Sequence, residues 1–259
     1  MRMMKKVLGT VTVLALSVSL LAGCGSTAVS PVSSTASTAA ESTTSSVVSE
    51  TTSAAADENV AAAAQLLNDL TGSYQELWPV ILADEYQQTW LDDCTALVGE
   101  ENAEAAFEKL SSMVTGDVYG EDAVKAYANG GGAYFCGFTN SLATLTFDGE
   151  TSTISGTDKD GNVLFSHTYH YIGMEPVRGL YEFESDDADS GEFTYFFLAP
   201  DTSAETYHIE FRYGSDAEAL SQYDAGEYAY WVASGISTDC DQTMIDNCIE
   251  LFCTENLAG

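Results

Sequence analysis

Basic residues are scarce in this chain of 259 residues, which has 8 Lys and Arg against 40 Asp and Glu and a formal net charge of −32 at pH 7. Three of the basic residues, Arg2, Lys5 and Lys6, lie at the N-terminus, which leaves 5 for the rest of the chain. A strongly negative surface repels phosphate groups. Nucleic acid and anionic lipid headgroups are therefore poor partners, and most carboxylates are expected to serve solubility.

Histidine is also scarce, with only His167, His170 and His208. The sequence has no HExxH string, no glycine-rich phosphate loop and no evident nucleophile–base pair, so we do not expect an enzyme. It also lacks C-x-x-C, which argues against a zinc knuckle and against a thioredoxin-like redox site. His167 and His170 are three positions apart in a predicted strand, so they should point to opposite faces and not share a ligand.

The N-terminal segment has the features of an export signal. Its first six residues include Arg2, Lys5 and Lys6, and residues 7–20 form an apolar run of signal-peptide length that is too short to span a membrane comfortably. The run ends in Leu21-Ala22-Gly23-Cys24, which resembles the lipobox of bacterial lipoproteins. The resemblance implies a lipid on Cys24 that would anchor the protein to the bacterial cell membrane, outside the cytoplasm. An ordinary signal peptide with a chance cysteine is the alternative.

Three regions follow from composition. Residues 1–24 are the signal peptide, and residues 25–56 consist almost entirely of Ser, Thr and Ala. Such a segment has too little apolar surface to offset the entropy lost on ordering, so it is expected to be a disordered tether. Residues 57–259 are long enough for one domain with a substantial core.

Five cysteines lie in the predicted domain. Outside the cytoplasm disulfides are permitted, but the odd number leaves at least one thiol free. Cys240 and Cys248 are expected to be too far apart along a helix to bond each other. The pairing is otherwise open among Cys94, Cys136, Cys240, Cys248 and Cys253.

The predicted domain divides into a helical part and a strand-rich part. Apolar spacing predicts helices near 57–70, 84–97, 101–113 and 121–128, and a final helix near 238–253. Strands are predicted at 133–138, 142–147, 151–156, 163–172, 180–184, 193–198 and 206–213. Asp148-Gly149 and Asp160-Gly161 are hairpin turn signals. Short strands joined by hairpins favour an antiparallel meander closed into a small barrel, because closure removes exposed edges.

One strand carries the most informative pattern. In residues 207–213 Tyr, Ile, Phe and Tyr alternate with His208, Glu210 and Arg212, and Ser215 or Asp216 is placed to cap a helix that begins at Ala217. With Leu198-Ala199-Pro200 upstream, this stretch resembles the metal-binding core of the ZinT/YodA family of bacterial extracytoplasmic zinc proteins. Residues 73–82 and 178–184 are similar to two further family segments. The resemblance covers most of residues 65–255 and implies a lipocalin-like (calycin) barrel with flanking N- and C-terminal helices, an α+β and mainly β fold.

The resemblance also implies where a metal site would lie. In the family, three histidines hold zinc: one before the Ala-Pro and a His-x-His pair after it. Here the second of the pair corresponds to His208, the first falls at Thr206 or Glu205, and the upstream histidine falls near Phe196. Glu205 and Glu210 would supply oxygen ligands, whereas Arg212 on the same face would oppose a cation or neutralise Glu210. A zinc site, a reshaped and weaker site for another divalent cation, and a lost site with no metal all remain open.

Two functional hypotheses follow. The first is a lipid-anchored protein that captures zinc or a similar ion and passes it to a metal-uptake transporter. The second is a calycin binding module without metal, whose cavity takes a small organic ligand or whose surface takes a protein partner. Dense aromatic residues at 195–197 and 228–231 support the second, although such residues more often belong to a core.

Overall fold

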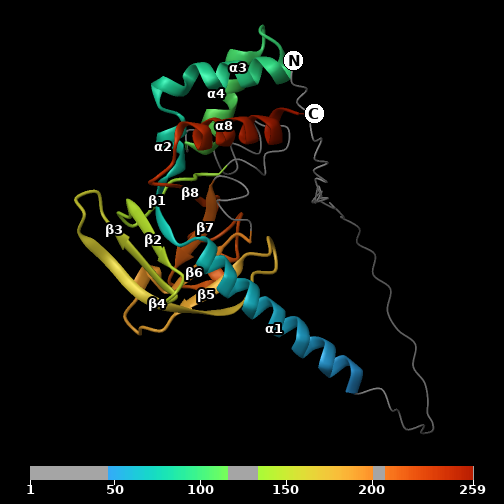
Figure 1. The fold of residues 1–259 in the computed structure, drawn as a ribbon, viewed down its shortest axis with the longest axis vertical. Helices are drawn as coiled ribbons and strands as arrows, with labels where there is room; N and C mark the ends of the chain where they lie inside the picture. The colour runs from blue at the N-terminus through green and yellow to red at the C-terminus, as the bar shows by residue number, and fades with distance from the viewer. Residues whose placement is uncertain (1–45, 116–133, 201–207, 259) are drawn as a thin grey trace, which may run out of the picture. The chain divides into compact units, whose positions relative to one another are not determined.

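The computed structural model describes residues 46–115, 134–200 and 208–258, with side chains described from residue 58 onward. The helices α2, α3, α4 and α8 lie together on one side of a β-barrel, and α1 packs against strands β2 and β4 (Figure 1). The helical elements are α1 (Ser46–Asp69), α2 (Leu77–Ile81), α3 (Gln87–Val98), α4 (Ala103–Val114), α7 (Ala217–Leu220) and α8 (Gln242–Leu257), with 3-10 turns η1 (Asp84–Tyr86) and η2 (Gly191–Phe193).

Eight antiparallel strands form a closed barrel in simple sequence order. Each strand pairs with the next, and β1 also pairs with β8, so Tyr74 lies opposite Leu145 on one side and Ser237 on the other. The strands are β1 (Gly72–Glu76), β2 (Thr144–Asp148), β3 (Thr153–Thr157), β4 (Val163–Met174), β5 (Tyr181–Ser185), β6 (Tyr195–Leu198), β7 (Ile209–Gly214) and β8 (Ala233–Ser237). This architecture confirms the predicted barrel with flanking helices.

The two predicted hairpin turns join neighbouring strands. Asp158 closes the β3–β4 connection by accepting hydrogen bonds from the backbone of Asp160 and Asn162, and Gly161 adopts a φ of 80° that favours glycine. Gly149 follows β2 where the backbone of α1 comes close, and a Cβ there would lie 2.4 Å from the Cα of Asn68. Glycine at 149 therefore allows α1 to pack against this end of the barrel.

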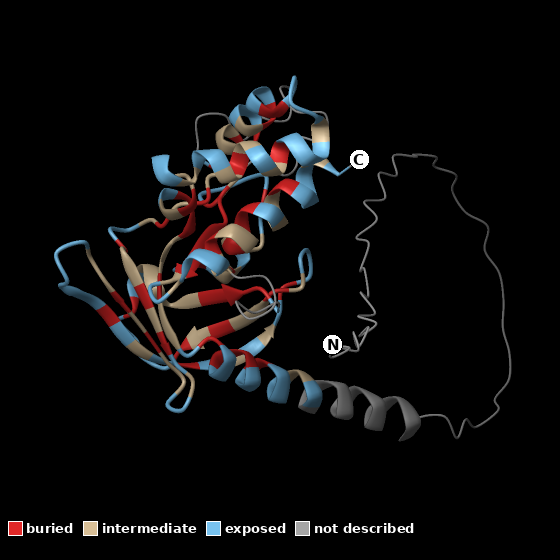
Figure 2. Ribbon diagram, turned by 45° about the horizontal axis from the view of Figure 1, so that its top comes forward, coloured by how far each residue is buried: buried red, intermediate tan, exposed pale blue. Residues whose placement is uncertain are grey.

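Aromatic side chains fill the barrel interior. Phe183, Phe196, Phe211 and Tyr213 are each at most 1% exposed, and the Phe196 and Tyr213 rings stack at 5.4 Å. Buried positions follow the barrel strands and the inner faces of the helices (Figure 2). The described interior is therefore a packed core.

A second core lies between the helices and the outer surface of the barrel. Trp90 of α3 is fully buried and its indole N–H donates to the carbonyl of Ile81 at 2.7 Å. The Phe252 ring of α8 contacts the rings of Trp78 and Trp90 at 4.6 and 6.0 Å. The α8 helix begins after Asp241, whose carboxylate accepts a hydrogen bond from the Met244 N–H at 2.9 Å.

Some predicted boundaries differ from the structure. The first helix begins at Ser46 rather than 57, and the alanines at 54–56, directly before the predicted start, favour this extension. The last helix begins at Gln242 rather than 238, and Cys240 precedes it. The helix predicted at 121–128 lies outside the described residues. Asp216 caps α7 as predicted, accepting from the Ala219 N–H at 3.0 Å.

The strand predicted at 133–138 is wrong, and two strands were not predicted. In the described part of that segment, Phe135 forms only an isolated bridge with Trp231. The Phe138 N–H donates to the Glu76 carboxylate at 2.6 Å instead of to a carbonyl of a neighbouring strand. The unpredicted strands, β1 and β8, are short and rich in glycine and serine.

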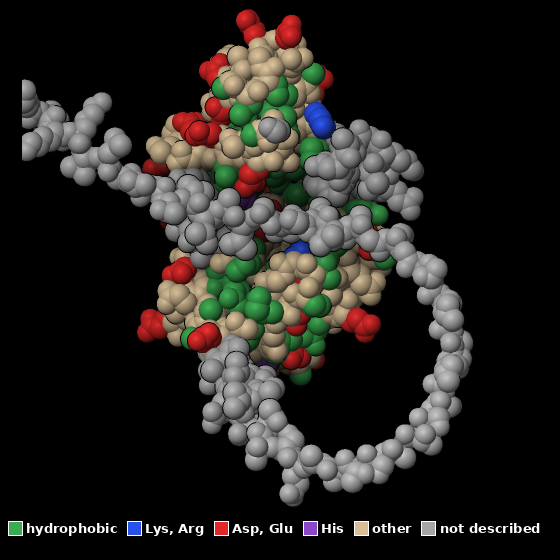
Figure 3. Space-filling model, turned by 90° about the vertical axis from the view of Figure 1, so that its right-hand side faces the viewer, with side chains coloured by type: hydrophobic (Ala, Val, Ile, Leu, Met, Phe, Trp, Pro, Cys, Tyr) green, Lys and Arg blue, Asp and Glu red, His purple; other side chains and the backbone are tan. Residues whose placement is uncertain are grey.

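Acidic side chains are spread over the face drawn in Figure 3, on the barrel and the helices alike, and basic side chains are sparse there. Among the helices that the structure describes, none has both the length and the apolar character needed to cross a membrane.

Candidate functional site

Strand β7 places Glu210 on the outer surface of the barrel, and His208 lies directly before the first residue of this strand. Ile209, Phe211 and Tyr213 point inward and are at most 2% exposed, so the alternating positions face outward. Glu210 lies opposite Ser234 of β8, and its carbonyl accepts a hydrogen bond from the Ala199 N–H at 3.0 Å. The backbone of Glu210 is thus held on both sides.

The two side chains form a close pair. His208 Nε2 lies 3.9 Å from Glu210 Oε1, and the side chains are 18% and 44% exposed. Burial alone would raise the pKa of the Glu210 carboxyl, but its interaction with His208 and the charge of Arg178 hold that pKa below its usual value. Glu210 is therefore a carboxylate at neutral pH, available as an oxygen ligand.

Helix α8 brings two more potential ligands to this place. A cavity of about 70 Å³ lies between β7, α2 and α8, and its lining includes His208, Glu210, Cys248 and Glu255. An imidazole, two carboxylates and a thiol suit zinc and similar ions. No three such groups within the described residues converge closely enough to hold a metal ion as they stand. A bound ion would require the α8 side chains to move towards the His208–Glu210 pair.

The residues do not fit the three-histidine arrangement of the ZinT/YodA family. Phe196, at the position expected for the upstream histidine, is fully buried and lies opposite Tyr213 on the inner face of the barrel. A side chain at 196 therefore points away from Glu210 and Arg212. Glu205 and Thr206 lie outside the described residues. The residue directly opposite Glu210 on the neighbouring segment is Ala199, which follows the last residue of β6 and shares the face of Glu210.

Arg212 does not neutralise Glu210, contrary to one of the two expectations. Its guanidinium is fully buried and donates to the backbone carbonyls of Leu220, Gln222 and Tyr228, the second at 3.3 Å. It also lies 4.3 Å from the centre of the Tyr223 ring. Arg212 therefore holds the 220–228 segment against β7, and the positive charge that acts on Glu210 comes from His208 and Arg178.

His167 and His170 point to opposite faces of β4, as predicted. His167 is partly buried and stacks on Phe165, whereas His170 is exposed. Each pairs at 2.8 Å with a carboxylate of the acidic loop between β5 and β6, His167 with Asp187 and His170 with Asp186. These pairs hold the loop on β4 and give no shared site.

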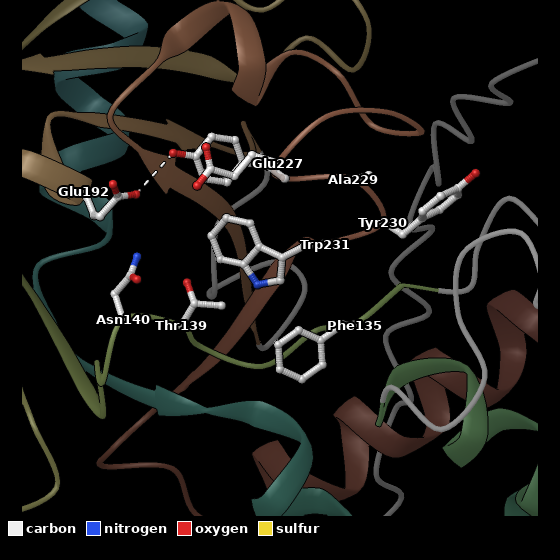
Figure 4. Close-up of a pocket in the computed structure, with 9 residues that line it drawn as sticks. Phe135, Thr139, Asn140, Glu192, Glu227, Ala229, Tyr230 and Trp231 are labelled. Carbon is white, nitrogen blue, oxygen red and sulfur yellow. Dashed lines mark hydrogen bonds between the residues drawn. The ribbon is translucent and has the colours of Figure 1, made fainter.

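A second cavity lies near one end of the barrel, a position that the sequence had not indicated. It measures about 280 Å³ and is lined by rings of Phe135, Tyr228 and Trp231 together with the carboxylates of Glu192 and Glu227. The Tyr228 hydroxyl donates to Glu192 at 3.2 Å, and the Tyr230 ring is turned away from the other lining side chains (Figure 4). The aromatic run at 228–231 was a visible signal, but only the fold brings Glu192 to it.

Comparisons with known proteins give distant structural similarity only. No family model matches the chain, and no curated protein matches it in sequence. The chain is similar to the zinc(II)-bound ZinT-like domain of AdcA from Streptococcus pneumoniae, with 16% identity, a TM-score of 0.45, and coverage of 71% of this chain and 89% of that domain. It is also similar to zinc(II)-bound AdcA itself, with 15% identity, a TM-score of 0.43, and coverage of 71% of this chain and 35% of AdcA. Similarity this distant says nothing of what the present chain binds.

Proposed function

We propose that this chain is an extracytoplasmic, lipid-anchored protein that captures a divalent cation of the zinc type weakly at His208 and Glu210. The observation that carries the proposal is the His208–Glu210 pair, 3.9 Å apart on the outer face of β7. The lowered pKa of Glu210 and the donor atoms of Cys248 and Glu255 in the same cavity support it. Glu205 enters as a further ligand from the sequence alone.

The anchor and the division of the chain belong to the same proposal. Residues 1–24 are the signal peptide, Cys24 carries the lipid, residues 25–56 are the tether and residues 57–259 are the ZinT-like domain. A captured ion would be cargo that the protein passes to an uptake transporter. We propose no catalytic role.

Isothermal titration of the full chain with zinc at neutral pH tests the metal site, with Cys24→Ser to remove the lipid. We expect a Kd of about 1 μM or weaker, because only two ligands lie together. His208→Ala and Glu210→Gln should each weaken binding at least about tenfold, or ~1.4 kcal/mol. His170→Ala is the matched control, since it removes an exposed imidazole that is also paired with a carboxylate. Binding that is unchanged by His208→Ala and Glu210→Gln would refute the site.

Labelling of cells with a radioactive fatty acid tests the anchor independently. The wild-type chain should carry label, and Cys24→Ser should not. A secreted wild-type protein without label would contradict lipid anchoring and would leave the metal site untouched.

The cavity near the barrel end favours a second candidate function, the binding of a small organic cation. Its described lining contains no Lys or Arg, and it combines carboxylates with the faces and edges of aromatic rings. Carboxylates and aromatic rings together attract quaternary ammonium groups. Because the barrel interior is packed, such a ligand would lie at this end of the barrel rather than inside it.

Titration with choline, followed by tryptophan fluorescence, tests the second candidate. Trp231 lines the cavity, whereas Trp78 and Trp90 lie in the other core. A saturable change that disappears in Trp231→Phe and weakens in Glu192→Gln would support it. If the fluorescence does not change up to about 10 mM choline, the Kd is too weak for specific binding, and the second candidate function is rejected.

A further inference from the structure

Two buried cysteines that are distant in sequence meet between α3 and α8. Cys94 Sγ and Cys253 Sγ are 3.9 Å apart, and both residues are fully buried. No other sulfur–sulfur contact of this kind occurs among the described cysteines. The Cys136 thiol instead donates to the carbonyl of Tyr134 at 3.4 Å. Of the pairings that the sequence leaves open, the fold therefore selects one.

We propose that Cys94 and Cys253 form a disulfide bond that joins α3 to α8. To bond, the sulfur atoms must approach from 3.9 Å to about 2.05 Å, a movement that side-chain rotation and a small adjustment of the packed helices can supply. The pair lies beside the Trp90–Phe252 ring contact, which already fixes the two helices against each other. The bond thus fits the existing packing.

The reaction is thiol–disulfide exchange with a disulfide-bearing oxidant, either a small molecule or an oxidoreductase. The thiolate of one cysteine attacks the disulfide RSSR and releases one RSH, which leaves a mixed disulfide. The second cysteine then displaces the other RSH. Two electrons and two protons leave the protein, and the oxidant is reduced to two thiols.

The bond should form during folding rather than afterwards. Both sulfur atoms are inaccessible in the folded domain, because Cys94 and Cys253 are fully buried, so an oxidant cannot reach either thiol there. Oxidation must therefore take place before α3 and α8 close over the pair. An oxidant added to the reduced, folded protein should react slowly.

The bond would also fix one wall of the candidate metal cavity. Phe252 is adjacent to Cys253 in α8 and lines the cavity with Cys248 and Glu255. In the cell the proposal rests on the extracytoplasmic location proposed above, because a disulfide persists only in an oxidising compartment. Refolding in vitro separates the chemistry of the pair from that location.

The experiment uses the full chain with Cys24→Ser, unfolded, reduced and refolded in a mixture of reduced and oxidised glutathione. After denaturation, thiol labelling should find three free thiols instead of the five domain cysteines that are free in the reduced protein. Peptide mapping should identify one cross-linked pair, Cys94 with Cys253. Reduction of the refolded protein should lower Tm by roughly 10 °C.

Variants assign the bond. Cys240→Ser should retain the cross-link and the Tm difference between oxidised and reduced protein, and Cys253→Ser should lose both. If Cys253→Ser does not fold, mapping of the otherwise unchanged chain still decides the pairing. Five free thiols after refolding, or a cross-link that involves Cys136, Cys240 or Cys248, would overturn the proposal. A cross-link in vitro with reduced cysteines in the cell would support the pair and contradict the proposed location.

Discussion

The buried guanidinium of Arg212 offers the sharpest test of the packing described above. Replacement by Met keeps an unbranched apolar stem of similar bulk to that of Arg but removes every hydrogen-bond donor. The carbonyls of Leu220, Gln222 and Tyr228 would then lose their charged partner in a buried place.

The magnitude follows from those three contacts. A buried acceptor that loses its donor costs about 1–3 kcal/mol, and the lost contact with the Tyr223 ring adds up to about 2 kcal/mol. Removal of a desolvated charge offsets part of this loss. We therefore expect Arg212→Met to lower the free energy of unfolding by about 3–5 kcal/mol, which is a large fraction of the stability of a domain. Arg212→Lys should recover only part, since an ammonium group cannot reach all three carbonyls.

Urea unfolding followed by circular dichroism measures the loss, and equal m-values would show that wild type and variants unfold alike. The control is Arg178→Met, which removes an exposed guanidinium 5.1 Å from the same Tyr223 ring and should cost less than about 1 kcal/mol. If Arg212→Met lies within about 1 kcal/mol of wild type, or if Arg178→Met is equally destabilising, Arg212 does not hold the 220–228 segment as described.

Three further predictions concern the metal site, the N-terminal segment and alkaline stability. Ala199→His should tighten zinc binding at least about tenfold, because position 199 shares the face of Glu210. Phe196→His should leave zinc binding unchanged, because position 196 is on the inner face of the barrel. Equal effects of the two variants would refute the assigned faces. Deletion of residues 25–56 should leave Tm unchanged within error, since the α1 side chains that the structure describes, from Glu58 onward, are first buried at Ala63; a drop of several degrees in a thermal melt would show that the deleted segment packs on the domain. Burial raises the pKa of Tyr213 to about 12, above its ordinary value near 10. Its contribution to stability is therefore complete below pH 10 and is lost as pH rises towards 12. The slope of stability against pH in that window should become shallower in Tyr213→Phe, and an unchanged slope would contradict the assignment.

Much of the barrel was predictable because its central strands carry their own signals. Strands β4 and β7 show alternating apolar residues, and the turns after β2 and β3 contain Asp-Gly. The strands that close the barrel lack such signals. In β8, Gly235 lies close to the Ile209 side chain, which leaves little room for a larger residue. Only pairing with the partner strands makes this short glycine- and serine-containing segment a strand.

In the candidate site, too, some residues could be placed from a local sequence pattern and others only from the fold. Alternation along one strand was enough to place His208 and Glu210 on a common face. Cys248 and Glu255 reach the cavity only through the packing of α8 against α2, which no local pattern encodes. Arg212 was misjudged in part because its position on the strand gives its face but not the direction of its long side chain, which turns towards the carbonyls of a later loop.

The pairing of β1 with β8 has a consequence for how the domain is made. Tyr74 finds its partner Ser237 only in β8, so the barrel cannot close until β8 has been synthesised. Until then β1 and β7 each present a row of unpaired N–H and C=O groups, the kind of edge that recruits strands from other molecules. Pairings this distant in sequence also form slowly. A fragment that stops before Ala233 would keep both edges open permanently, so chains that lack β8 are expected to aggregate while chains that contain it do not.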